Sequence, residues 1–134
     1  MRRRQIVTTV LSALGATVFT AAAAAAYPAC VSRTLTPSPA LTNTYESCVL
    51  DEQVLLNNLY HAGLRPPYVA VPANGHYGPL TAGDVGRFNR RWLGTDAGVT
   101  YSRTWDELCK QNQAHGFRGD YWRTAGCNLV PAGA

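Results

Sequence analysis

The sequence predicts an all-α protein: a compact three-helix domain stabilised by disulfides. Three stretches carry apolar residues at the 3.6-residue spacing of an amphipathic helix. Glycines or threonine capping patterns stand at the ends of these stretches. An even number of cysteines follows a segment with the composition of an export signal. Together these features are typical of a small exported helical domain.

Residues 1–26 have the order of a secretory signal peptide: basic residues, an uncharged run and a small-residue end. Ala24 and Ala26 match the Ala-x-Ala cleavage pattern, and a second option cuts after Ala29. The alternatives are an uncleaved membrane anchor and a lipid-modified Cys30. We expect a secreted protein, extracellular or associated with the cell wall, without membrane contact after cleavage.

The formal net charge of +4 belongs mostly to this signal. Without Arg2, Arg3 and Arg4 the chain keeps nine basic residues against eight acidic ones. This near balance argues against nucleic acid as a partner. The mature chain of about 105 residues suffices for one domain with a core, and we expect a monomer.

Residues 27–46 are rich in Pro, Ser and Thr and lack apolar periodicity, so we expect an extended leader, with structure beginning near Ser47. A helical rhythm follows, and Gly63 supplies a left-handed stop, which predicts a helix from about Cys48 to Ala62. The residues that share one face of this helix are Cys48, Leu55 and Leu59.

Two further helices are predicted from capping patterns. Thr81 and Thr104 are each followed three residues later by an acidic residue, as in a capping box. Apolar residues at helical spacing come next in both places. The sequence therefore predicts helices over about 82–93 and from Trp105 to near Gly116.

The two predicted helix starts form an internal repeat. A shift of 23 residues lays residues 74–81 over 97–104, so that Gly75 meets Gly98 and Thr81 meets Thr104. Each unit consists of a glycine turn, a short loop and a capped helix. Such self-similarity indicates a duplicated structural unit.

The residues of these units are Gly75-His76-Tyr77-Gly78-Pro79-Leu80-Thr81, Val85, Phe88-Asn89, Asp96-Ala97-Gly98-Val99, Arg103-Thr104-Trp105 and Leu108. This pattern resembles the peptidoglycan-binding-like domain of bacterial cell-wall proteins. That family typically reads Asp-Gly-x-Phe/Tyr-Gly-x-x-Thr, a helix with Val and Phe-Gln, then Asp-Gly-x-Val-Gly-x-x-Thr-Trp and Leu. The resemblance covers residues 47–110, with 111–134 as a C-terminal extension, and implies a compact three-helix domain that binds peptidoglycan.

The chain departs from the family pattern at several positions. Asn74 replaces Asp, Asn89 replaces Gln, Ala97 is an insertion, and Tyr101 replaces the second unit's glycine. A glycine there commonly serves a positive φ, which costs other residues about 1 kcal/mol or more. Either the second loop is rebuilt or Tyr101 takes an ordinary backbone conformation.

The four cysteines, Cys30, Cys48, Cys109 and Cys127, indicate two disulfides. Zinc is the competing use, but no C-x-x-C pair occurs and the histidines are scattered singly. Sequence alone leaves three pairings open. In the fold implied by the resemblance, the start of the first helix lies near the end of the third. That arrangement favours Cys48 with Cys109, and Cys30 with Cys127.

The resemblance implies peptidoglycan, through its glycan or its stem peptide, as the partner. Aromatic faces stack on sugars, and arginine pairs carboxylates bidentately. The candidate ligand-binding residues are His76, Tyr77, Arg87, Arg90, Arg91 and Tyr101. The alternative places Tyr77 in the core and the arginines on a solvated helix face. The aromatic and basic residues of 115–123 either extend the binding surface or pack on the core.

No catalytic motif is found, so we expect a non-enzymatic protein without cofactor or metal. The sequence holds no nucleophile elbow and no zinc-peptidase motif. Asp106 and Glu107 diverge on a helix, while Asp51 and Glu52 fit compensation of the dipole at a helix start. The alternative function is a secreted interaction or inhibitor protein that reuses the same scaffold.

Overall fold

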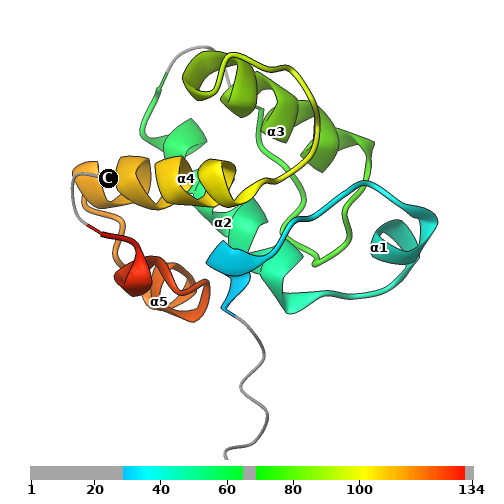
Figure 1. The fold of residues 1–134 in the computed structure, drawn as a ribbon, viewed down its shortest axis with the longest axis horizontal. Helices are drawn as coiled ribbons and strands as arrows, with labels where there is room; N and C mark the ends of the chain where they lie inside the picture. Colours follow the sequence, from blue (N-terminus) through cyan, green and yellow to red (C-terminus); the bar gives the residue numbers. More distant parts are fainter. Residues whose placement is uncertain (1–28, 65–68, 132–134) are drawn as a thin grey trace, which may run out of the picture.

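The computed structural model describes residues 29–64 and 69–131; the predicted signal peptide at 1–26 lies outside them. In these residues the chain forms α-helices and short 3-10 helices, which confirms the all-α prediction. The elements in order are η1 (Cys30–Ser32), α1 (Pro39–Asn43), α2 (Ser47–His61), α3 (Pro79–Trp92), α4 (Ser102–Ala114), α5 (Asp120–Thr124) and η2 (Cys127–Leu129) (Figure 1).

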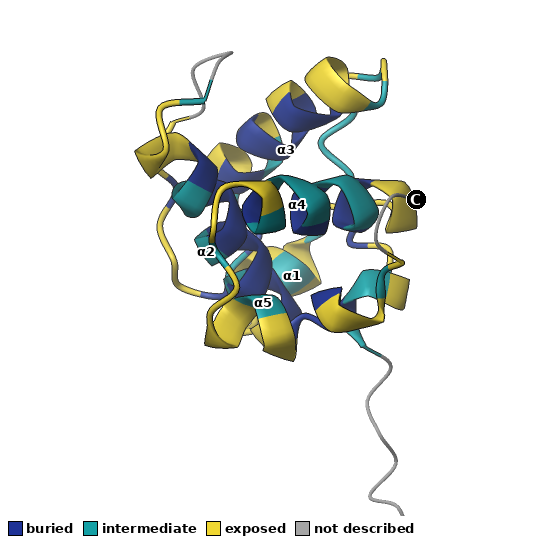
Figure 2. Ribbon diagram, turned by 90° about the vertical axis from the view of Figure 1, so that its left-hand side faces the viewer, coloured by how far each residue is buried: buried dark blue, intermediate teal, exposed yellow. Residues whose placement is uncertain are grey.

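The three long helices enclose the core. The helix α2 packs against α3, α4 and α5, and the buried faces of the long helices turn towards one another (Figure 2). Its buried leucines are Leu55, Leu56 and Leu59. They lie in one cluster with the aromatic rings of Tyr77, Phe88 and Trp105, all essentially unexposed. The predicted first helix, 48–62, therefore agrees with α2 to within one residue at each end.

The helices α3 and α4 begin three residues before their predicted starts. Pro79 and Ser102 are their first helical residues, so Thr81 and Thr104 stand inside the first turn. Proline suits the first helical position, because its fixed φ is already helical and its missing N–H would have no helical partner. The Oγ1 of Thr104 still accepts a hydrogen bond from the backbone N of Tyr101, at 3.0 Å. The acids predicted to cap these helices serve elsewhere.

The internal repeat is structural at the entries to the two helices, whereas the turn glycines differ, because Gly75 has a positive φ and Gly98 does not. The residues before the two helices, Gly78 and Tyr101, share nearly the same backbone angles: φ −88° and ψ −178°, against φ −87° and ψ 168°. Tyr101 thus takes an ordinary extended conformation, and so does the glycine of the first unit. Replacement of a glycine by tyrosine is tolerated because neither residue has a positive φ.

A buried amide side chain holds each glycine turn to its helix. Gln53 Oε1 accepts the backbone N–H groups of Asn74 and Gly75, while its Nε2 donates to the carbonyl of His76 and to Thr81 Oγ1. These four distances lie between 2.9 and 3.0 Å. Gln53 is fully buried, and its bonds to Gly75 and Thr81 are buried as well.

Asn89 performs the same task in the second unit. Its Nδ2 donates to the carbonyls of Ala97 and Val99, and its Oδ1 accepts from Thr104 Oγ1, each at 2.8 Å. The two units also meet directly, because the Tyr77 hydroxyl lies 3.2 Å from Thr100 Oγ1. Tyr77 and Thr100 are equivalent under the 23-residue shift, so the repeat packs against itself.

The prediction of an extended leader over 27–46 is wrong for the described residues 29–46. Leu35 is buried and pairs through two backbone hydrogen bonds of 2.9 Å with Thr100. The carbonyl of Arg33 accepts from Trp105 Nε1 at 3.0 Å. The buried Leu35, the backbone pairing and the disulfide of Cys30 hold this segment in place, and none of these produces a periodic pattern. The leader is therefore part of the folded domain.

The preferred cysteine pairing is also wrong. The disulfides are Cys30–Cys48 and Cys109–Cys127, with Cα–Cα distances of 5.4 and 5.3 Å. Because the leader returns to the start of α2 and the C-terminal segment folds back on α4, each cysteine bonds a partner 18 residues away. Closing such loops stabilises the fold by about 3 kcal/mol each in the entropic account. Two disulfides indicate an oxidising compartment.

The C-terminal extension packs on the core with part of its aromatic residues. Trp122 is partly buried against the cluster, and its Nε1 donates to the carbonyl of Cys109 at 3.1 Å. The guanidinium of Arg118 stands over the Trp122 ring at 5.8 Å. Tyr121, which precedes Trp122 in the sequence, points outwards with 43% of its surface exposed. The segment therefore both covers the core and presents an aromatic ring.

Candidate binding sites

The arginines predicted to bind ligand lie on the outer face of α3 and are engaged with neighbouring residues. Arg87 lies 3.6 Å from the Asp84 carboxylate, and Arg90 lies 3.1 Å from Asp96. Arg91 stands over the ring of Trp92 at 4.8 Å. The pair of Arg90 and Asp96 is 72% exposed on both sides, so it adds little stability. This face is accessible but presents arginines that already have partners.

The other predicted ligand residues are dispersed. Tyr77 is buried, and its hydroxyl donates to the carbonyl of Gly98 at 2.9 Å. This position agrees with the alternative that placed Tyr77 in the core. Tyr101 precedes α4 and is partly exposed. His76 lines a cavity of about 220 Å³ with Asn74 and Leu80. The six residues therefore do not converge on one pocket.

A groove of about 760 Å³ lies where the leader, the start of α2 and α5 meet. Its size falls in the range of ligand-binding clefts. The disulfide Cys30–Cys48 contributes to its lining. The side chains that matter for binding are those of Arg33, Tyr45, Glu46, Asp51, Tyr121 and Thr124. Asp51 belongs to α2, and Glu46 is the residue before its first turn. The other four side chains come from the leader and from α5, the segments that flank the three long helices.

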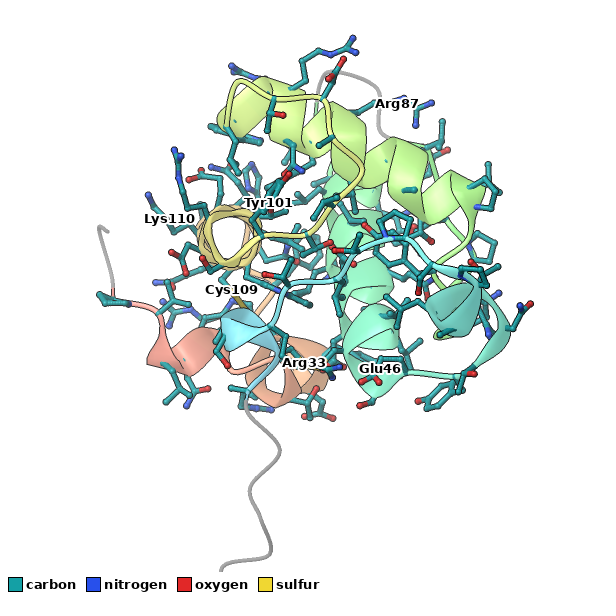
Figure 3. The ribbon with its side chains drawn as sticks, turned by 45° about the vertical axis from the view of Figure 1, so that its right-hand side comes forward. Arg33, Glu46, Arg87, Tyr101, Cys109 and Lys110 are labelled. Atoms are coloured by element: carbon teal, nitrogen blue, oxygen red, sulfur yellow. A yellow bond between two sulfur atoms is a disulfide. The ribbon has the colours of Figure 1, made fainter. Side chains whose placement is uncertain are left out.

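The charged groups of the groove are held in place. Arg33 Nη1 lies 2.6 Å from Glu46 Oε1, and the two side chains point towards one another between η1 and α2 (Figure 3). Asp51 Oδ1 accepts a hydrogen bond of 3.0 Å from Thr124 Oγ1. Burial raises the pKa of Asp51 to about 6, although the Thr124 hydroxyl opposes this shift. The groove thus offers carboxyl acceptors beside a paired guanidinium.

Two tyrosines give the groove aromatic surface. Tyr45 is 56% exposed and Tyr121 is 43% exposed. The Tyr45 ring lies against Gly75, where any side chain would overlap the ring, and Glu46 N donates to Gly75 O at 2.9 Å. Gly75 also has φ +75°, a conformation that favours glycine. The first glycine turn therefore supports one aromatic wall of the groove.

Two carboxyl groups lie deeper, inside the core. Glu52 accepts a hydrogen bond from Thr100 Oγ1, and its Oε2 has no partner among the described residues. Burial raises the pKa of Glu52 to about 8, and the nearby charge of Asp84 adds to the shift. Burial also raises the pKa of Asp84 to about 6, opposed by the Val69 amide and Arg87. Glu52 is therefore a buried core residue, whereas the sequence predicted a position at a helix start, where it would compensate the helix dipole.

Sequence reasoning missed the groove because its walls come from distant segments without a shared motif. Tyr45 and Glu46 stand in the predicted leader, and Tyr121 stands in the extension.

Within residues 29–64 and 69–131, no cluster of three or more His, Cys, Asp or Glu could bind a metal. None of the helices in these ranges combines the length and the apolarity needed to cross a bilayer.

Comparison of the chain with protein-family models, curated proteins and solved structures finds no match in any of the three. Function is therefore inferred from the residues and their geometry.

Proposed function

We propose that this chain is a secreted, non-enzymatic module that binds bacterial cell-wall peptidoglycan, on a fold of the peptidoglycan-binding-like type. The observation that carries the proposal is the duplicated unit of glycine turn and helix. Gln53 anchors the first unit and Asn89 the second, and Thr81 and Thr104 occupy the same place in the two helices. Thr81 and Thr104 belong to the motifs on which the family resemblance rests, and Asn89 stands where the family has glutamine.

Two other features support a binding role outside the cell. The disulfides Cys30–Cys48 and Cys109–Cys127 suit a domain that works in an oxidising environment. The carboxyl groups of Glu52 and Asp84, whose pKa values are raised, are fully buried, where they cannot reach a substrate. The accessible groove instead presents aromatic rings and hydrogen-bonding groups suited to recognition.

Sedimentation with purified sacculi, freed of teichoic acids, tests the proposal on the secreted protein with its disulfides formed. We expect a pelleted fraction that rises with the amount of wall and saturates. Absence of retention at all wall concentrations would contradict wall binding. Capture of a protein partner in that case would favour the interaction or inhibitor alternative.

The predicted α3 contacts need a separate variant. Arg91→Ala removes an exposed guanidinium that stands over the ring of Trp92. Retention falls if α3 contacts the wall, and it stays unchanged if the wall binds elsewhere. Tyr77→Ala is unsuitable for this purpose, because the loss of a buried ring would destabilise the core.

A further inference from the structure

We infer that the groove between the leader, α2 and α5 binds the glycan strand of peptidoglycan, as a β-1,4-linked chain of N-acetylated sugars. This assignment rests on the proposed function and gives it a site. The groove lies on the opposite side of the molecule from Arg87 on α3, so it is distinct from the predicted contact surface (Figure 3).

Aromatic surface is the first argument. Tyr45 and Tyr121 line the same groove, and each residue remains about half exposed. The apolar faces of sugar rings stack on such aromatic faces, while the hydroxyl of a tyrosine can bond at the wet edge. The Tyr45 ring is supported from behind by the Gly75 turn. A ring held in this way loses less conformational entropy on binding.

Hydrogen-bonding chemistry is the second argument. Glu46, whose side chain is 27% exposed, offers carboxyl oxygens, and Ser47 offers a hydroxyl, while the buried Asp51 holds the Thr124 hydroxyl in the lining. Sugar hydroxyls and acetamido N–H groups are donors that carboxyl oxygens accept well. The groove therefore combines stacking faces with acceptors, which is the combination that an N-acetylated glycan requires.

Charge separates the glycan from the stem peptide. Among the described residues that line the groove, Arg33 is the one cationic side chain, and Glu46 already neutralises it at 2.6 Å. No unpaired cation in the lining is left to take the free carboxylates of a stem peptide. The remaining acid, Asp51, repels them wherever it is ionised. A glycan without carboxylates meets neither obstacle.

The matched variants are Tyr45→Ala and Tyr121→Ala in the groove and Tyr60→Ala outside it. Tyr60 is 42% exposed near the end of α2, so its removal takes away a comparable aromatic surface without touching the groove. Thermal unfolding of each variant verifies folding. Calorimetric titration with the tetramer of β-1,4-linked N-acetylglucosamine then measures glycan binding, and a free stem pentapeptide is titrated in parallel.

We expect the tetramer to bind the wild type and Tyr60→Ala equally. Each groove variant should lose at least about fivefold in affinity, as for a truncated binding hot spot. The inference is overturned if both groove variants bind the tetramer as well as the wild type, if the folded wild type fails to bind it, or if the pentapeptide alone binds.

Sedimentation of the same variants with sacculi separates this inference from the proposed function. Retention of the wild type and of both groove variants to the same extent leaves wall binding intact and overturns the groove assignment. Loss of tetramer binding in the groove variants, without any retention of the wild type on sacculi, leaves a glycan site and contradicts the wall as its source.

Discussion

The two glycine-turn units share the backbone conformation at their helix entries, Gly78 and Tyr101, but are held by different means. Gln53 belongs to α2 and bonds the first turn, whose residues follow it in the sequence by 21 positions or more. Asn89 belongs to α3 and bonds the turn that immediately follows its own helix, eight to fifteen residues on. Gln53 satisfies two backbone donors and two acceptors, whereas Asn89 satisfies two carbonyls and one hydroxyl.

The difference shows that the amide anchor of a repeated unit can come from a distant helix in one copy and from the preceding helix in the other. The first turn is bonded to α2 through Gln53 and supports Tyr45 at the groove. The second turn is bonded to α3 through Asn89 and to Tyr77, and Thr100 beside it pairs with Leu35 of the leader. The first unit thus links the core to the groove, and the second links the core to the leader.

The largest expected effect concerns Glu52, at the junction of the two units. Its pKa rises from 4.5 to about 8 on folding, so the native state holds a proton that the unfolded chain releases above pH 4.5. The stability from this group is complete below about pH 4.5 and is lost as the pH rises to 8, by up to about 5 kcal/mol. Urea unfolding at pH 4.5, 6 and 8 measures this loss.

Glu52→Gln is the control for that measurement. Glutamine retains an oxygen that accepts from Thr100 and cannot ionise, so stability should become nearly level between pH 6 and 8. Below pH 6, Asp51 and Asp84, whose pKa values are also raised, should still contribute a slope of the same sign. A wild-type protein that gains stability from pH 4.5 to 8 would contradict this account.

Removal of the two amide anchors is expected to have the next largest effect. Gln53→Ala removes the partner of four groups in the first unit, two of them in buried bonds, and should cost about 3 kcal/mol in free energy of unfolding. Asn89→Ala leaves three and should cost about 2 kcal/mol. Gln113→Ala, on the partly exposed side of α4, serves as the control with less than about 0.5 kcal/mol. Denaturant unfolding with all three variants gives the order, and equal losses at Gln53 and Gln113 would refute the anchoring role.

The smallest effects distinguish two glycines of the first unit. Gly75→Ala forces a side chain into positive φ and against the Tyr45 ring, so it should cost about 2 kcal/mol. Gly78→Ala meets no atom within 4 Å and keeps φ −88°, so its effect should stay within about 0.5 kcal/mol. Melting temperatures of the two variants verify this difference. A strongly destabilised Gly78→Ala would contradict the equivalence with Tyr101.

Features that depend on short-range pattern were accessible from the sequence. Apolar spacing located α2, the threonine patterns located α3 and α4 to within three residues, and the 23-residue shift predicted equivalent turns. The three-residue error arose because a threonine inside the first turn resembles a threonine before it. Pro79, at the first helical residue, was the signal that could have corrected the start of α3.

By itself the sequence determined the helical class, the extent of the long helices, the repeat and the formation of two disulfides, because helical spacing and cysteine number are local or compositional properties. Only the tertiary structure decided which cysteines pair, that Leu35 packs beside Thr100, that Glu52 is buried, and that Tyr45 and Tyr121 line one groove. Those results depend on how the leader and the C-terminal segment return to the core, and this return is set by packing among residues far apart in the chain.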